Sequence, residues 1–76
     1  MTKIGLTLKT VDGNVDFDVV KINGKFHVFN KIVDLNGKNK SLRIGEATTW
    51  QDVVVITKIY TGKEVLNIEK AVVLNN

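Results

Sequence analysis

The sequence predicts a small all-β domain, an antiparallel barrel or meander of five to six short strands. Apolar and polar residues alternate with a period of two along most of the chain, and glycine-containing turns separate these stretches. Several short strands hide their edges by closing or nearly closing into a barrel, and the absence of an OB-type helix favours an SH3-like over an OB-like form. A length of 76 residues allows one core, so residues 1–76 are expected to form a single domain.

The expected strands follow from the positions of the apolar residues. The first three alternate at Ile4, Leu6 and Leu8, then Val15, Phe17 and Val19, then Phe26 and Val28. A short fourth strand is expected around Leu42 and Ile44, and the run from Val53 to Tyr60 is apolar on both faces, as in a central strand. The inner face of the last strand is expected to hold Leu66, Ile68, Val72 and Leu74.

The dipeptide Asp12-Gly13 predicts the first hairpin, because both residues tolerate the positive φ of a type I′ turn. A two-residue loop there places Leu8 opposite Phe17. It also leaves Ile4 opposite Lys21, a mismatch that a bulge in the second strand would repair.

The dipeptide Asn23-Gly24 predicts the second hairpin and places Val19 opposite Val28. Both hairpins then agree on which face of the sheet is the core, and a slip of one residue would destroy that agreement. On the other face the two registers predict a charge ladder formed by Lys9, Asp16 and Lys31.

Residues 45–52 interrupt the strand pattern. Thr48 and Gln51 have the spacing of a capping box, which is typical of a helix start. The β-branched run that follows leaves room for at most one helical turn near residues 46–52. We therefore expect a short connector that carries Trp50.

The residues needed for catalysis or for holding a cofactor are missing. The chain has no cysteine, a single histidine, His27, and a single serine, Ser41, so thiolate zinc sites and histidine-based metal clusters are excluded. The acidic series from residue 12 to 18 has the spacing of a calcium loop but lacks its glycine and its final glutamate. We expect no enzyme, no cofactor, no metal site and no catalytic residue.

The composition also bears on location and origin. No apolar run approaches the roughly 18 residues that a membrane span needs, so we expect a cytoplasmic protein without membrane contact. Lysine far outnumbers arginine, and asparagine is frequent. This bias is typical of an A·T-rich genome, such as that of a low-GC bacterium or its phage, and fits a phage or mobile-element accessory protein.

Basic charge is concentrated between Lys25 and Arg43, where five basic residues accompany one acid, a net +4 in a chain whose total is +3. Strand alternation places basic and aromatic side chains on one outward face there, as in platforms for single-stranded nucleic acid. Asp16 and Asp18 share that face and weaken this interpretation. The candidate nucleic-acid-binding residues are Lys25, His27, Phe29, Lys38, Lys40 and Arg43.

The function favoured most is a non-catalytic protein-interaction module. Apolar residues face outward beside Trp50 and Tyr60. If no partner covers these residues, closure of the barrel has to cover them. The expected partner is another protein or a second copy of the chain, as in a homodimer. The candidate anchors are Phe29, Trp50 and Tyr60, with Lys38, Lys40 and Arg43 attracting an acidic partner.

Overall fold

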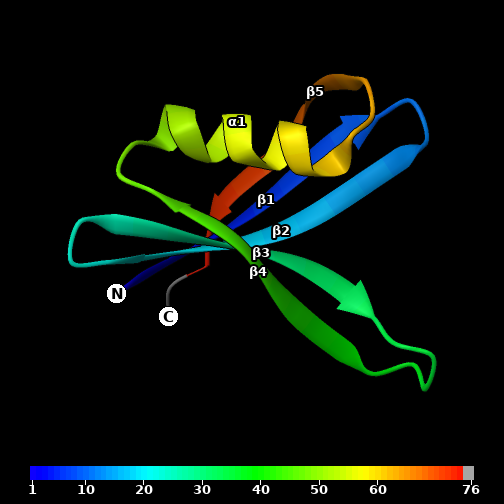
Figure 1. The fold of residues 1–76 in the computed structure, drawn as a ribbon, viewed down its shortest axis with the longest axis horizontal. Helices are drawn as coiled ribbons and strands as arrows, with labels where there is room; N and C mark the ends of the chain where they lie inside the picture. Colours follow the sequence, from blue (N-terminus) through cyan, green and yellow to red (C-terminus); the bar gives the residue numbers. More distant parts are fainter. Residues whose placement is uncertain (75–76) are drawn as a thin grey trace.

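A computed structural model describes residues 1–74 and contains one antiparallel sheet with a single helix on one face (Figure 1). Its elements are β1 (Thr2–Thr10), β2 (Gly13–Ile22), β3 (Lys25–Val33), β4 (Asn39–Ala47), α1 (Trp50–Thr61) and β5 (Val65–Val73). The strand order is β4-β3-β2-β1-β5, so the prediction of a small all-β antiparallel domain of five to six strands is confirmed. β1 to β4 form a meander, and β5 crosses back to pair with β1. The sheet is open, because β4 and β5 form its two edges instead of pairing to close a barrel. Within the described part of the chain, no helix is long and apolar enough to cross a membrane.

The second hairpin has the predicted register. Asn23 and Gly24 both have positive φ, at 52° and 76°, as a type I′ turn requires. Val19 therefore lies opposite Val28, and Phe17 lies opposite Asn30.

The first hairpin is shifted by two residues from the predicted register, because its loop is formed by residues 11 and 12. Leu6 lies opposite Phe17, and Ile4 lies opposite Val19. Thr10 stabilises this turn, since its hydroxyl donates to the Gly13 carbonyl at 2.7 Å and accepts the residue-12 N–H at 3.1 Å. A shift of two keeps every side chain on its predicted face, and the mismatch at Ile4 disappears without a bulge.

The Lys9–Asp16 step of the predicted charge ladder is wrong, whereas the second hairpin keeps the register on which the Asp16–Lys31 step depends. The same shift in register places Lys9 opposite Asn14 and Asp16 opposite Thr7. The Thr7 hydroxyl donates to Asp16 Oδ1 at 2.6 Å, so a neutral donor takes the place that Lys9 was expected to fill.

The expected strand over residues 53–60 is wrong, and so is the limit of one helical turn near 46–52. Residues 46 and 47 still belong to β4, and α1 runs for 12 residues from Trp50. Thr49 caps its start, accepting the residue-52 N–H at 3.2 Å, and Gly62 ends it with a φ of 63°. Helical spacing puts Val53 and Thr57 on one side, where both are fully buried.

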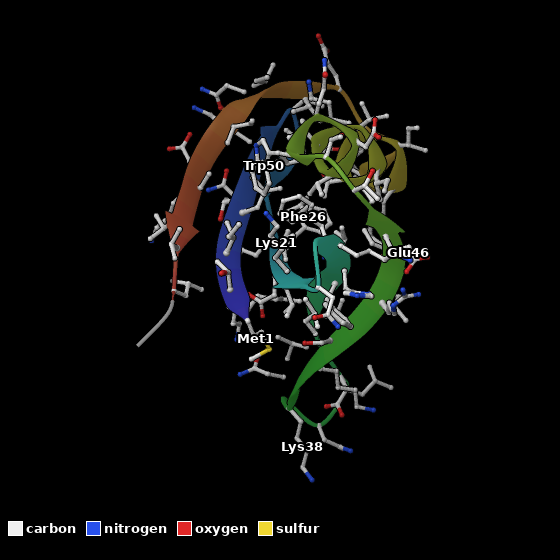
Figure 2. All side chains as sticks on the ribbon, turned by 90° about the vertical axis from the view of Figure 1, so that its left-hand side faces the viewer. Met1, Lys21, Phe26, Lys38, Glu46 and Trp50 are labelled. Atoms are coloured by element: carbon white, nitrogen blue, oxygen red, sulfur yellow. The ribbon has the colours of Figure 1, made fainter. Side chains whose placement is uncertain are left out.

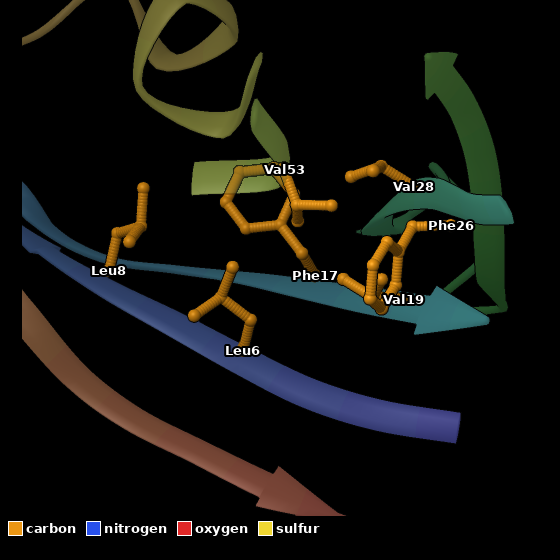
Figure 3. Close-up of a cluster of buried hydrophobic side chains, with 7 residues drawn as sticks. All are labelled: Leu6, Leu8, Phe17, Val19, Phe26, Val28 and Val53. Carbon is orange, nitrogen blue, oxygen red and sulfur yellow. The ribbon is translucent and has the colours of Figure 1, made fainter. Parts of the chain in front are cut away.

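The core lies between α1 and the face of the sheet beneath it. Figure 3 shows its buried apolar side chains, which are Leu6, Leu8, Phe17, Val19, Phe26, Val28 and Val53. The helix packs against β3 and β4. It lies so close to β4 that a Cβ at Gly45 would be 3.3 Å from Ile56 Cγ2.

β5 pairs with β1, and this pairing contains two register shifts. Each shift leaves one residue of β5 without a partner in β1. Ile68 lies opposite Leu8 and shares the core face, whereas Val72 lies opposite Gly5 on the other face. The expected single inner face through residues 66, 68, 72 and 74 is therefore wrong, because each shift moves the following residues to the opposite side.

Candidate protein-interaction site

The predicted nucleic-acid-binding residues of β3 lie on the outer face, the sheet face opposite α1. There Phe29 pairs across the strands with Asp18 and with Arg43 of β4, and His27 pairs with Glu46. Basic and aromatic side chains thus share one face, as the alternation predicts.

Glu46 neutralises much of this basic group. Its carboxylate lies 3.7 Å from Lys25 Nζ and accepts a hydrogen bond from Arg43 Nη2 at 2.9 Å. Arg43 Nη2 is also 3.2 Å from His27 Nδ1. Figure 2 labels Glu46 on β4, the strand next to these β3 residues. Sequence reasoning missed Glu46 because the register shift between β3 and β4 decides which β4 side chains share the outer face with the β3 residues.

The two remaining lysines of the predicted set belong to the hairpin that joins β3 to β4. Lys40 Nζ is 3.5 Å from Asp34 Oδ2, and Asp34 Oδ1 accepts the backbone N–H groups of Asn36 and Lys38 at 2.9 Å each. Lys38 stands at the far end of the molecule from Trp50 (Figure 2). These lysines therefore do not join the aromatic residues in one surface.

Trp50 and Tyr60 both turn toward the core. The Trp50 ring lies edge-on to Phe26 with 6.0 Å between centroids, and the Tyr60 ring lies edge-on to Phe17 at 6.1 Å. The Tyr60 hydroxyl donates to Asn30 Oδ1 at 3.2 Å, and 42% of the residue stays exposed. The two rings hold α1 on the sheet and leave only part of their surface to a partner.

β5 carries a series of uncovered apolar residues. Its apolar residues Leu66, Ile68, Val72 and Val73 are between 39% and 61% exposed. Three of its residues, Ile68, Ala71 and Val73, lie opposite the core-facing side chains of β1, and we term them the β5 flank. The helix has its main backbone contacts with β4 and β3, and every residue of β5 after Val65 is exposed.

Two charged residues, Glu69 and Lys70, stand next to each other in the middle of β5. Both are exposed, and neither forms an ion pair with any other residue from 1 to 74. Apolar residues precede and follow them. The charged pair therefore sits near the centre of an edge strand whose other residues, apart from Asn67, are apolar.

The accessible surface of the molecule is 5123 Å². Folded monomers of 8.5 kDa expose about 4,700 Å² on average. The difference agrees with a core that lacks cover at one edge.

Sequence reasoning identified the apolar residues of β5 but assigned them to an inner face. The alternation alone does not tell which strands a helix will cover, so no signal in the sequence marks this edge as exposed.

No family model matches the chain, and neither the curated proteins nor the solved structures contain a match. In residues 1–74, no group of three or more His, Asp or Glu side chains is placed to hold a metal ion. The candidate site therefore depends on the geometry of β5 itself.

Proposed function

We propose that this chain is a non-catalytic protein-interaction domain that self-associates through β5. The observation that carries the proposal is the edge position of β5 with its uncovered apolar flank. An apolar strand at the edge of a sheet is a surface that proteins either protect or use for binding. Edge-to-edge contact with a second copy would cover part of this apolar strand.

The charged pair favours a second copy as the partner. In an edge-to-edge twofold arrangement whose axis passes between residues 69 and 70, the two β5 strands run antiparallel and Glu69 of each copy lies opposite Lys70 of the other. Two opposite-charge contacts then form, one on each side of the twofold axis. The apolar residues before the charged pair in one copy lie opposite those after the pair in the other copy. The register shifts of β5 disfavour a long backbone ladder between copies, so side chains provide most of the contact.

This proposal keeps the function favoured by the sequence and moves the surface. Trp50 and Tyr60 contribute indirectly, since they fix α1 over β3 and β4 and so leave β5 uncovered. Phe29 and the basic residues Lys38, Lys40 and Arg43 lie outside the proposed interface.

Sedimentation velocity over a range of protein concentrations tests the proposal. We expect the wild type to form dimers with increasing concentration and Ile68→Lys to weaken the association at least tenfold, because it buries a charge in the interface. Ile59→Lys is the matched control, since Ile59 is 74% exposed on α1 outside the flank. A wild type that stays monomeric up to about 1 mM, or equal effects of the two variants, would overturn the proposal.

Binding of single-stranded nucleic acid is a second proposal with less support. The presence of Phe29 and His27 on the outer face favours it, because rings on an open sheet can stack on bases. The ion pairs that Glu46 forms with Lys25 and Arg43 oppose it, because they reduce the positive charge available to phosphates.

A further inference from the structure

The hairpin that joins β3 to β4 stands away from the rest of the sheet. The pairing of β3 with β2 ends at Asn30, whereas β3 and β4 stay paired as far as Val33 and Asn39. Figure 1 shows this hairpin diverging from the hairpin of β1 and β2. Every residue from 31 to 43 except Asp34 is exposed. We term residues 31–43 the β3–β4 arm, a two-stranded ribbon that is open to solvent on both faces.

Positive charge is concentrated in this arm. Its four basic residues and one acid give a net charge of +3, which equals the net charge of the whole chain. Arg43 at the base of the arm donates a hydrogen bond to Glu46, so three lysines remain for a partner. Two of them, Lys31 and Lys38, form no ion pair within residues 1–74. The arm therefore presents positive charge that the rest of the molecule does not compensate.

Asp34, the one acid of the arm, is engaged in the turn. Its Oδ1 atom accepts the backbone N–H groups of Asn36 and Lys38 at 2.9 Å each, and its Oδ2 atom lies 3.5 Å from Lys40 Nζ. The Asp34 side chain is 20% exposed, whereas that of Lys40 is 60% exposed. The carboxylate thus fixes the turn, and the Lys40 ammonium stays at the surface.

The lysines lie on both faces of the ribbon. Lys31 pairs with Ser41 on the outer face, and Lys40 pairs with Ile32 on the opposite face. Lys38 belongs to the turn at the end of the arm, where Figure 2 shows it projecting from the molecule. A flat anionic surface, such as a membrane, would meet only the end of such an arm. A groove with anionic walls on both sides would meet all three lysines.

The dimensions of the arm fit the major groove of duplex DNA. That groove is about 12 Å wide and about 8.5 Å deep, and it admits a two-stranded β-ribbon. The four residues from 31 to 34 extend the arm by about 13 Å beyond the last pair with β2, so its end reaches the floor of the groove. Leu35 stands in the turn and is fully exposed, so it contributes no packing to the fold. An aliphatic side chain at this position can contact base edges, such as the methyl group of thymine.

We propose that the β3–β4 arm binds duplex DNA by inserting into its major groove. The three lysines contact phosphates on both sides of the groove, and Leu35 contacts the bases. Asp16 and Asp18 line the hollow at the base of the arm and repel phosphates, so the contact is confined to the arm itself. The proposal does not depend on self-association, because the arm ends in β4 and the β5 flank lies at the other edge of the sheet.

Fluorescence anisotropy of a labelled DNA duplex of about 20 base pairs at about 50 mM salt tests the arm. We expect a micromolar dissociation constant and a salt dependence with a log–log slope of about −3, one phosphate for each lysine. Lys31→Gln combined with Lys38→Gln should weaken binding at least tenfold and reduce the slope by about two. Lys9→Gln combined with Lys58→Gln is the matched control and should weaken binding less than threefold. Both control lysines are exposed, lie outside the arm and form no ion pair within residues 1–74.

Leu35→Ser separates the contact with bases from the contact with phosphates. It should weaken binding about threefold and leave the salt slope unchanged, because no charge is lost. A duplex RNA of the same sequence should bind at least fivefold more weakly than the DNA, because its major groove is too deep and narrow for the ribbon. Leu35→Ser also remains informative if the double lysine variant fails to fold.

Four outcomes would overturn the proposal. Equal losses in the two double lysine variants would show that net charge alone acts. Equal binding of duplex RNA would exclude insertion into the major groove, and tighter binding of single-stranded DNA would assign binding to the outer face of the sheet. Sedimentation of the protein with phosphatidylserine vesicles, without binding to duplex DNA, would assign the arm to a membrane surface. Sedimentation velocity on the same variants distinguishes failure here from failure of self-association, since none of these substitutions alters β5.

Discussion

The two edges of this sheet differ in how they are covered. At β4, Ile56 of α1 packs over Gly45, and Glu46 forms ion pairs with Lys25 and Arg43. At β5 there is no helix, and the flank residues are exposed. The β4 edge therefore has paired charges and an apolar surface that α1 covers in part, although Leu42 is 48% exposed. The β5 edge has neither a covering helix nor an ion pair among residues 1–74.

The difference follows from the size of the chain. A sheet with one buried face needs a second layer across its whole width, and one helix of 12 residues covers about two strands. The helix has its main backbone contacts with β4 and β3, and most of β5 stays exposed. We infer that folding stability comes mainly from the core beneath α1, and we propose that recognition of a second copy belongs to β5.

Matched truncations on the two sides should show the largest contrast. Val53→Ala removes a fully buried side chain beneath α1 and should lower the free energy of unfolding by about 2 kcal/mol. Ile68→Ala removes a side chain that is 42% exposed and should lower it by less than about 1 kcal/mol. Urea denaturation at low protein concentration measures both, and equal losses would contradict the division between the sides.

A charge exchange in β5 should produce the next largest effect, on association. Lys70→Glu places glutamates opposite each other in the proposed twofold contact and should weaken dimerisation about tenfold. Adding Glu69→Lys restores opposite charges across the axis and should recover most of the loss. Sedimentation equilibrium of the single and double variants measures the change. A double variant as weak as the single one would show that the two residues do not meet.

Local sequence signals predicted the strands and one hairpin but not the helix. Asn23-Gly24 fixed its turn because both residues adopt positive φ with little strain. The run from Val53 to Ile56 is β-branched and favours a strand locally, yet it forms a helix. Burial decides the case, since helical spacing brings Trp50, Val53 and Tyr60 onto Phe26 and Phe17.

The candidate site was harder to predict than the fold. The sequence indicated apolar residues outside the core, but their location depends on which strands α1 covers and on the register shifts of β5. Asp18 was placed correctly on the outer face by alternation. Its burial depends on neighbours from other strands, such as Phe29, and alternation carries no information about them.

Asp18 provides a contrast with Glu46, because the Glu46 carboxylate accepts a 2.9 Å hydrogen bond from Arg43, whereas the buried Oδ1 atom of Asp18 accepts none within residues 1–74. Asp18→Asn removes a buried charge that has no hydrogen bond and should raise the free energy of unfolding by about 1 kcal/mol. Loss of the 3.7 Å ion pair with the half-exposed Lys3 offsets only part of this gain. Thermal and urea denaturation provide the measurement. A destabilised variant would mean that the carboxylate contributes to folding through its ion pair with Lys3.

The smallest expected effect concerns the paired charges beside β4. Glu46→Gln should change the free energy of unfolding by less than about 0.5 kcal/mol, because its ion pairs are exposed. It also frees Lys25 and Arg43, so binding of a single-stranded oligonucleotide at about 50 mM salt should tighten severalfold and weaken again with added salt. Fluorescence anisotropy measures this, with Glu69→Gln as a control that makes the same change of net charge on the other edge. Equal tightening in the two variants would show that net charge alone acts. No tightening in Glu46→Gln would show that pairing with Glu46 does not restrain the basic residues, and tight binding by the wild type would show that they are already available to nucleic acid.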